Sequence, residues 1–256
     1  MKNLAGKTIF ITGASSGIGR ELARMFSMMG SKLILLDMDL DGLKKLNLKA
    51  ELIKCDLSKK EEIDKIKADF LKKTDVLINN AGIGAKEFFL KEDYSEFERI
   101  VNVNFFGMTY LTKRFLNNID FKKKRFIVNV CSIAGVVHVP FMGAYSSSKA
   151  AAYNFTNLLR IELHDKNIKV MAVIPGPTKT KFGQDFKNSI KHGNFYEKHV
   201  VLKPEKVARA IISGIQKEKK SIFIPWYLKI TAIFCNVFPF FYDFLATVSL
   251  KRIKVK

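Results

Sequence analysis

The sequence is poor in cysteine, and the cysteines that it has are not arranged for a shared task. Cys55, Cys131 and Cys235 are odd in number, lie far apart and form no CxxC pair. Neither a disulfide framework nor a zinc site is therefore predicted. Such a chain suits a reducing compartment, so we expect a cytoplasmic protein. The first apolar run, residues 8–11, is too short for the core of a signal peptide.

Acidic residues are also scarce. The chain has 24 of them against 44 lysines and arginines, which gives a formal net charge of +20 at pH 7. This excess indicates either an anionic partner or surface, or a general bias toward lysine. No nucleic-acid recognition motif and no stripe of basic and aromatic residues accompanies the charge, so nucleic-acid binding is not expected. A chain of 256 residues can bury one large core.

The first segment of the chain has the pattern of a strand, a glycine-rich turn and a helix. Residues 8–12 are β-branched or apolar, and Ile18 and Leu22 begin a series at helical spacing. Gly13, Gly17 and Gly19 lie at the turn, where glycines let the backbone approach a pyrophosphate that the helix N-terminus attracts. The spacing is GxxxGxG rather than the common GxGxxG. The segment therefore predicts a dinucleotide site.

An aspartate ends the second predicted strand. Residues 32–36 form an apolar run, and Asp37 follows at the point where an acidic residue meets the adenosine ribose in dinucleotide-binding folds. A carboxylate there binds the ribose hydroxyls and repels a 2′-phosphate, and no basic residue follows before Lys44. NAD is therefore favoured over NADP. The alternative is a solvated turn aspartate, because Asp39 and Asp41 are close by.

Strand and helix patterns alternate along the rest of the chain. Further strands are predicted at 51–56, 75–79, 126–130 and 221–225, and a helix over 204–216. Ser58 and Glu61 have the spacing of a capping box at a helix start. This alternation predicts an α/β fold with a doubly wound parallel sheet and ligands at the carboxyl ends of its strands.

A serine, a tyrosine and a lysine have spacings that suit acid–base chemistry. Tyr145 and Lys149 are four residues apart, so on a helix they share one face. A free phenol loses its proton only near pH ~10, but a close ammonium favours the phenolate. Lys149 is therefore expected to lower the pKa of Tyr145. Ser132 follows the predicted strand 126–130. Alone, a tyrosine and a lysine at this spacing are more often surface packing than catalytic.

Six motifs in order resemble the short-chain dehydrogenase/reductase family. They are TGASSGIG at 12–19, NNAG at 79–82, NVNFFG at 102–107, Ser132, YSSSK at 145–149 and PGPTKT at 175–180. The resemblance covers residues 5 to about 225 and implies a single Rossmann-type domain over 1–225. It also implies a parallel sheet of about seven strands, a nicotinamide cofactor and a homodimer or homotetramer.

The resemblance implies a catalytic set with no member missing. Tyr145 would act as the acid or base, and Ser132 would hydrogen-bond the same substrate oxygen. Lys149 would hold the nicotinamide ribose as well as tune Tyr145. Asn104 would hold a water that passes protons between Lys149 and solvent. Read alone, Asn104 could instead be a helix-bending polar residue and Ser132 a strand-end cap.

The same resemblance implies the cofactor contacts. The glycine turn would bind the phosphates, Asp37 the adenosine ribose, Asp56 and Leu57 the adenine, and the NNAG segment the ribose and ring. The segment after Pro175 would bind the nicotinamide. The full set is Gly13, Ser15, Gly17, Ile18, Gly19, Asp37, Asp56, Leu57, Asn79, Ala81, Gly82, Tyr145, Lys149, Pro175, Gly176, Thr178 and Thr180.

The chain continues past the family pattern in an apolar and basic extension, 226–256. Residues 230–242 carry no charge, and as a helix they would span about 20 Å, short of a ~30 Å hydrocarbon core. Such a stretch predicts burial, either against another subunit or in one membrane leaflet, with the terminal lysines and arginine on anionic headgroups. Trp226, Tyr227 and Tyr242 favour peripheral contact with the inner face of a membrane.

These features favour an oxidoreductase that uses NAD, with NADP as the alternative cofactor. It would interconvert a secondary alcohol and a ketone on a small apolar or lipid-like substrate. Residues 178–203, which have no clear periodicity, are expected to form a loop that covers this substrate. The alternative function is a cofactor-binding scaffold or membrane-recruited protein with little catalytic activity.

Overall fold

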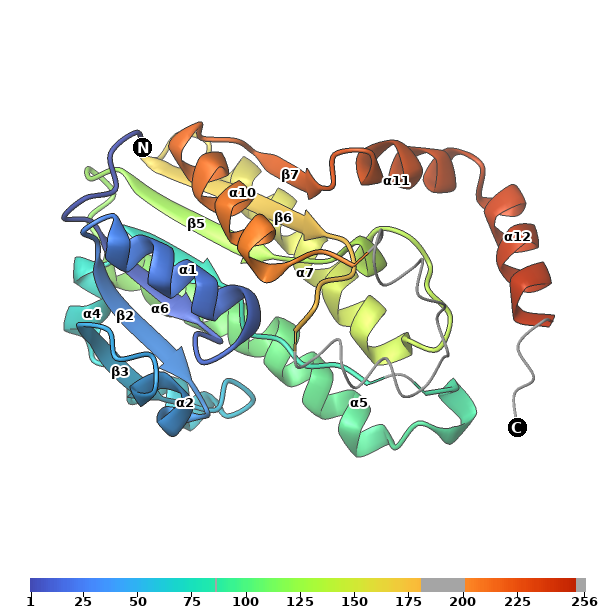
Figure 1. The fold of residues 1–256 in the computed structure, drawn as a ribbon, viewed down its shortest axis with the longest axis horizontal. Helices are drawn as coiled ribbons and strands as arrows, with labels where there is room; N and C mark the ends of the chain where they lie inside the picture. Colours follow the sequence, from blue (N-terminus) through green and yellow to red (C-terminus); the bar gives the residue numbers. More distant parts are fainter. Residues whose placement is uncertain (86, 181–200, 252–256) are drawn as a thin grey trace.

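One parallel sheet of seven strands lies between two layers of helices (Figure 1). The computed structural model describes residues 1–85, 87–180 and 201–251. The strand order is β3-β2-β1-β4-β5-β6-β7, so the chain crosses from one edge to the middle between β3 and β4. This reversal beside β1 creates the crevice in which doubly wound folds bind ligands. The strands are β1 Thr8–Thr12, β2 Lys32–Asp37, β3 Ala50–Lys54, β4 Val76–Asn79, β5 Arg125–Val130, β6 Ile168–Pro175 and β7 Ser221–Ile224.

The predicted α/β fold is confirmed, and most predicted strands agree within two residues. The helix over 204–216 has the predicted bounds. The capping box at Ser58 and Glu61 is wrong: helix α3, Lys60–Asp64, begins after Lys59, which makes no side-chain cap. The Ser58 hydroxyl instead donates to Asp56 Oδ1 at 2.8 Å.

Each face of the sheet has its own hydrophobic core. Helices α1 (Gly17–Met28), α2 (Leu40–Lys44) and α10 (Pro204–Gln216) cover one face, where Leu22, Phe26 and Ile211 are fully buried. Helices α3, α4 (Ala68–Lys73), α6 (Met108–Asn118) and α7 (Gly143–Glu162) cover the other. Since both faces are covered, the central strands β4 and β5 are buried along their whole length rather than alternating, whereas the edge strand β3 is mostly exposed.

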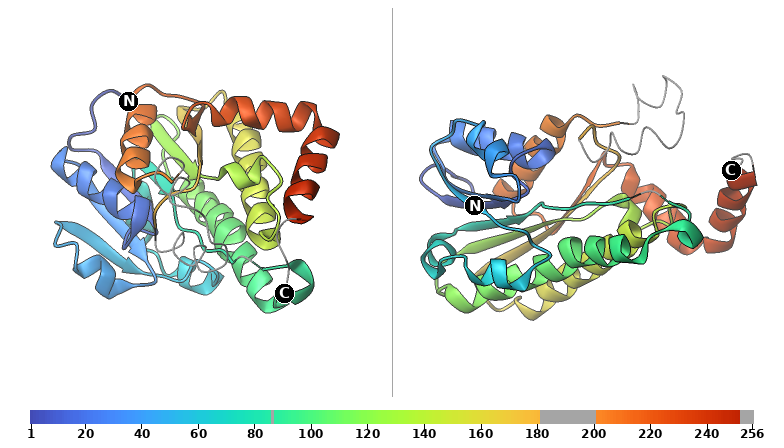
Figure 2. Two further views of the ribbon diagram at one scale, coloured as in Figure 1. Left: turned by 45° about the vertical axis from the view of Figure 1, so that its right-hand side comes forward. Right: turned by 90° about the horizontal axis from the view of Figure 1, so that it is seen from below.

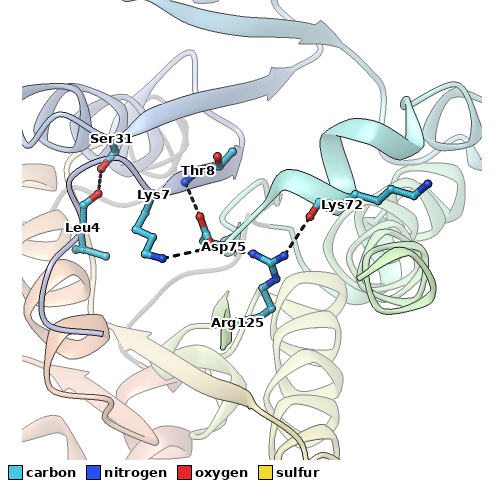
Figure 3. A network of polar contacts seen from close by, with 7 residues as sticks. All are labelled: Leu4, Lys7, Thr8, Ser31, Lys72, Asp75 and Arg125. Carbon is cyan, nitrogen blue, oxygen red and sulfur yellow. Dashed lines mark hydrogen bonds and ion pairs between the residues drawn. The ribbon is translucent and has the colours of Figure 1, made fainter. Parts of the chain in front are cut away.

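An ion-pair network connects the amino ends of β1, β4 and β5, at the end of the sheet opposite to the carboxyl ends of the strands (Figure 3). The Asp75 carboxylate accepts from the Thr8 amide at 2.9 Å and from Arg125 Nη1 at 2.7 Å. Arg125 also donates to the Lys72 carbonyl at 3.2 Å. A buried guanidinium paired and hydrogen-bonded in this way avoids the cost of an isolated charge. The carboxyl ends of the strands are left for function.

The C-terminal extension forms two helices rather than one. Helix α11, Leu228–Val237, and helix α12, Pro239–Lys251, project from the end of the molecule opposite to the N-terminus (Figures 1 and 2). The break falls at Phe238, because the residue before a proline is biased away from helical backbone. No single helix in the described ranges is long and apolar enough to span a membrane. The segments Leu228–Val237 and Pro239–Val248 pass that test only together, bent by 105°.

Candidate active site

The glycine turn after β1 is packed too closely for side chains. A Cβ added at Gly13 would lie 2.7 Å from Ala81 Cα, and one at Gly19 would lie 2.0 Å from the Gly13 carbonyl oxygen. Gly13 and Gly17 also have positive φ angles of 66° and 53°. Helix α1 begins here with no side-chain cap and no acidic residue in its first turn, so its N-terminus can receive an anion. The turn therefore fits a dinucleotide pyrophosphate.

Asp37 lies at the carboxyl end of β2 and is tied to the glycine turn. Its Oδ2 accepts from the Ser15 amide at 2.9 Å, and its Oδ1 accepts from the Asp39 amide at 3.0 Å. The carboxylate is therefore built into the turn and is not simply solvated. Asp56 and Leu57 follow β3, the strand next to β2, so all three residues lie at the same edge of the sheet. This edge can hold an adenosine.

The two adjacent asparagines after β4 point in different directions. Asn79 Nδ2 donates to Thr112 Oγ1 at 3.0 Å and to Asn129 Oδ1 at 2.8 Å, so the side chain of this predicted cofactor residue faces the interior. Asn80 instead donates to the carbonyls of Thr12 and Gly13 at 3.0 and 3.1 Å. Asn80 thus fixes the glycine turn, a role that the sequence analysis missed. Ala81 belongs to this side as well, because its amide donates to Thr12 Oγ1 at 3.0 Å.

Asn104 is buried in a π-helical turn, η2 (Asn102–Gly107), between α5 (Tyr94–Val101) and α6. Its amide donates to the Ile83 carbonyl at 2.8 Å and to Ser148 Oγ at 2.9 Å, and its Oδ1 accepts from the Ile83 amide at 2.9 Å. Every polar atom of the side chain is therefore engaged. Its predicted water-holding role stays a prediction.

Ser132 and Tyr145 meet at the carboxyl end of β5. Ser132 directly follows Cys131 after β5, and its side chain shares a hydrogen bond with that of Tyr145. Ser132 Oγ also accepts from the Ala134 amide at 3.1 Å, which starts the short helix η3, Ile133–Gly135. Tyr145 comes from the first turn of α7, the helix after η3. The two hydroxyls predicted to face one substrate oxygen are thus side by side.

Lys149 is buried one turn after Tyr145, and it does not lower the pKa of that residue. Its Nζ donates to the Val130 carbonyl at 2.9 Å and lies 5.9 Å from the centre of the Tyr145 ring. Burial raises the pKa of Tyr145 to about 12, and the hydrogen bond with Ser132 offsets this only in part. Burial likewise lowers the pKa of Lys149. The expected fall of the Tyr145 pKa is therefore wrong for this structure.

The segment after β6 lies beside the glycine turn. The Gly176 amide donates to the Ile224 carbonyl at 2.8 Å, which continues the pairing of β6 with β7 past Pro175. Thr178 Oγ1 donates to the Gly176 carbonyl at 2.9 Å, whereas the Thr180 methyl lies 2.8 Å from where a Gly17 Cβ would be. Of the two threonines predicted to contact the cofactor, Thr180 is the one beside the glycine turn. Most of the predicted covering loop, 181–200, lies outside the described residues.

The segment 136–142, between η3 and α7, contacts the C-terminal helices. Tyr242 of α12 donates to the His138 carbonyl, and Asn236 of α11 donates to the Val136 carbonyl at 3.2 Å. The same segment leads directly into the helix that carries Tyr145. The extension thus contacts the loop that leads into α7, and the aromatic spacing of the tail gave no signal of these two contacts.

A family profile described as "short chain dehydrogenase" matches residues 7–191. The chain belongs to the short-chain dehydrogenase family. This confirms the resemblance that its motifs indicated and makes it a member of an oxidoreductase family.

Two curated relatives cover nearly the whole chain. One is "Putative oxidoreductase SadH" of Mycobacterium tuberculosis, 30% identical over 98% of this chain and 98% of that protein. Another is "Estradiol 17-beta-dehydrogenase 11" of Homo sapiens, 33% identical over 100% of this chain and 86% of that protein. The similarity thus includes the C-terminal extension as well as the Rossmann-type domain.

Solved structures share the fold at lower identity. A short-chain dehydrogenase/reductase from Burkholderia phymatum in complex with NAD aligns with a TM-score of 0.80 at 23% identity, covering 94% of this chain and 97% of that one. A short-chain dehydrogenase from Sphingobium yanoikuyae in complex with NADPH aligns with a TM-score of 0.78 at 24% identity, covering 93% and 95%. Proteins of this fold thus bind either nicotinamide cofactor.

Proposed function

We propose that the protein interconverts a secondary alcohol and a ketone, with Tyr145 as the acid or base. The observation that carries this is the hydrogen bond between Ser132 and Tyr145 at the carboxyl end of β5, with Lys149 buried one turn away. A nicotinamide cofactor supplies or accepts the hydride when it is bound. The glycine turn, Asp37 and the segment after Pro175 are the groups proposed to hold it.

The residues of this chain would handle the charge and the proton at the substrate oxygen. During reduction the carbonyl oxygen gains negative charge, and two hydroxyl donors aimed at it stabilise that charge. Tyr145 then gives its proton to the oxygen, while Ser132 keeps the oxygen in line. The raised pKa of Tyr145 keeps the phenol protonated at neutral pH, as reduction requires. In the oxidative direction the same proton returns to Tyr145.

Replacing the phenol tests this function. Tyr145→Phe should abolish the oxidation of NADH by a panel of medium-chain ketones and leave NADH affinity nearly unchanged. Tyr153→Phe on the same helix is the matched control, and it should retain activity. Tight NADH binding by the wild-type protein without turnover on any ketone would favour the alternative, a cofactor-binding scaffold. Near-normal turnover of Tyr145→Phe would remove Tyr145 from the mechanism.

We further propose an apolar or lipid-like substrate that reaches the site from a membrane surface. The support is the exposed apolar surface of the extension, which meets segment 136–142 beside the site. Trp226 is 73% exposed and Phe240 is 89% exposed, and α11 buries only Ala232 and Cys235. Several exposed large apolar side chains in one short segment favour an interaction site over ordinary surface. Loss of liposome binding on truncation after Pro225, with the fold retained, tests this part of the proposal.

A homodimer or homotetramer is also proposed, through the outer surface of α6 and α7. A cleft of about 530 Å³ lies there, with Leu116, Phe155 and Leu159 in its lining. Phe106 is at its edge, and Ile161 is exposed further along α7. Ile161→Glu should shift the protein to a smaller mass in light scattering if this surface joins subunits.

A further inference from the structure

A second apolar element lies outside the C-terminal extension. The short helix η1, Phe89–Lys91, follows the segment after β4, and its apolar side chains face solvent. Phe89 is 64% exposed and Leu90 is 82% exposed, and the preceding Phe88 is 40% exposed. Three consecutive exposed apolar residues carry a free-energy cost in water that a soluble surface loop does not need.

The η1 segment and the extension hold the two sides of one loop. On the η1 side, the Glu87 amide donates to the Phe141 carbonyl at 3.0 Å, and the rings of Phe88 and Phe141 are 6.3 Å apart. On the other side, Tyr242 of α12 donates to the His138 carbonyl. The loop between them, 136–142, leads into Tyr145. Both apolar elements therefore border the approach to the active site.

The arrangement in space agrees with these contacts. Helix α12 and the segment that leads into α5, which contains η1, both extend from the end of the molecule opposite to the N-terminus in Figures 1 and 2. Phe141 lies on the loop between them with a positive φ of 64°, which is rare for a bulky side chain. Such strain persists only where the surrounding structure holds the residue in place.

We infer that η1 is a second membrane-inserting element, which enters the same leaflet as α11 and α12 and surrounds the mouth of the site with lipid. This rests on the proposed function only for the substrate, because insertion itself needs neither substrate nor cofactor. The exposed apolar side chains of η1, α11 and α12 fit a lipid surface better than a second copy of the chain. The exposed aromatic residues include Trp226 and Tyr227, types that favour the boundary between headgroups and acyl chains. The net charge of +20 also favours an anionic surface.

The contribution of η1 is apolar rather than electrostatic. Its one basic residue, Lys91, is outnumbered by Glu87, Glu92 and Asp93 around it, whereas Lys229 and the basic residues after 250 accompany the extension. Substitutions in η1 should therefore weaken membrane affinity by the same factor at low and at high salt. Loss of basic residues in the extension should weaken it mainly at low salt.

The single tryptophan of the chain makes insertion measurable. Trp226 fluorescence should be quenched by vesicles of phosphatidylcholine and phosphatidylglycerol that carry bromine on their acyl chains. The decisive variant moves this probe: Phe89→Trp in a Trp226→Phe background should be quenched by the same vesicles. Met28→Trp in that background is the control, because Met28 is 88% exposed at the far end of α1 and should not be quenched.

Affinity provides the second measurement. Phe89→Ser with Leu90→Ser should weaken vesicle binding about tenfold, whereas Met28→Ser should not change it. Tyr145→Phe should bind vesicles like the wild type, so failure of the catalytic proposal leaves this one intact. A tryptophan at 89 that stays unquenched while Trp226 is quenched would overturn the inference. The inference would also be overturned by a protein that does not bind vesicles and that light scattering shows to be a dimer, if that dimer dissociates in the Phe89→Ser variant.

Discussion

The Nζ atom of Lys149 lies 5.9 Å from the centre of the Tyr145 ring, and its hydrogen bond goes to the Val130 carbonyl rather than to the phenol. Lys149 is thus held beside the ring, and burial is the largest influence on the pKa of the phenol. The pKa of Tyr145 is raised to about 12 as a result. In this structure Tyr145 therefore keeps its proton at neutral pH.

The two reaction directions should therefore differ in their dependence on pH. Reduction needs the protonated phenol, which is the main form at every pH well below about 12, so kcat/KM for a ketone should be flat from about pH 6 to 9. Alcohol oxidation needs the phenolate, whose fraction rises about tenfold per pH unit in that range. Its kcat/KM should still be rising at about pH 9. A plateau in the oxidation profile near neutral pH would show that the Tyr145 pKa is low, as the sequence predicted.

Cofactor preference should depend on Asp37. NADH should give a higher kcat/KM than NADPH, because the carboxylate repels a 2′-phosphate. Asp37→Ala should reduce the ratio of the NADH kcat/KM to the NADPH kcat/KM by about tenfold or more. Asp37 also accepts from the Ser15 amide, so the same variant should bind NADH more weakly than wild type. Asp41→Ala is the control, since Asp41 is an exposed partner of Lys44. A wild-type preference for NADPH would contradict the assignment of Asp37 to the ribose.

Local patterns predicted the parts of the site that depend on short spacing. The glycine turn, Asp37 at the end of β2 and the pair Tyr145–Lys149 each follow from residues within one strand–turn–helix unit or one helix turn. The face of the sheet on which each connecting helix lies then follows from the handedness of parallel crossovers.

The rest depended on contacts between distant segments. Which of Asn79 and Asn80 faces the glycine turn is decided by the pleat of β4, and a shift of one residue exchanges the two faces. The raised pKa of Tyr145 comes from burial, which the spacing of Tyr145 and Lys149 does not show. The bend at Phe238 and the packing of Tyr242 on His138 likewise join the tail to a loop about a hundred residues earlier.

Gly82 lies where a side chain would disturb Lys149. A Cβ at this position would be 3.1 Å from Lys149 Nζ and 3.2 Å from Asn104 Oδ1. Gly82→Ala should therefore shift the ammonium by a few tenths of an ångström, and we expect kcat to fall about tenfold. Because both neighbours are side-chain ends, thermal stability should change little. Gly143→Ala, whose Cβ would meet nothing nearer than 3.4 Å, is the control and should stay active. Unchanged kcat in Gly82→Ala would show that Lys149 tolerates displacement.

Glu92 caps the helix that carries Tyr145, although it comes from another part of the chain. The N-cap residue of α7, Met142, makes no side-chain cap. The Glu92 carboxylate instead hydrogen-bonds the Ala144 amide, whereas its buried Oε2 has no hydrogen-bond partner among the described residues. Burial, with Glu87 and Glu96 nearby, raises the pKa of Glu92 despite this hydrogen bond. The cap therefore holds a charge that the fold disfavours.

Two substitutions separate the cap from its charge. Glu92→Ala removes the acceptor, so the free energy of unfolding should fall by about 1 kcal/mol and kcat should fall as the first turn of α7 loosens. Glu92→Gln keeps an acceptor and removes the charge. Because the folded-state pKa of Glu92 is raised, the stability linked to its proton is present at acid pH and is lost as pH rises through that pKa. Glu92→Gln should therefore be as stable as wild type or more so at pH 7, and its advantage should disappear below the ordinary carboxyl pKa. Urea unfolding at both pH values measures this, and a Gln variant as unstable as the Ala variant at pH 7 would show that the cap needs the charge.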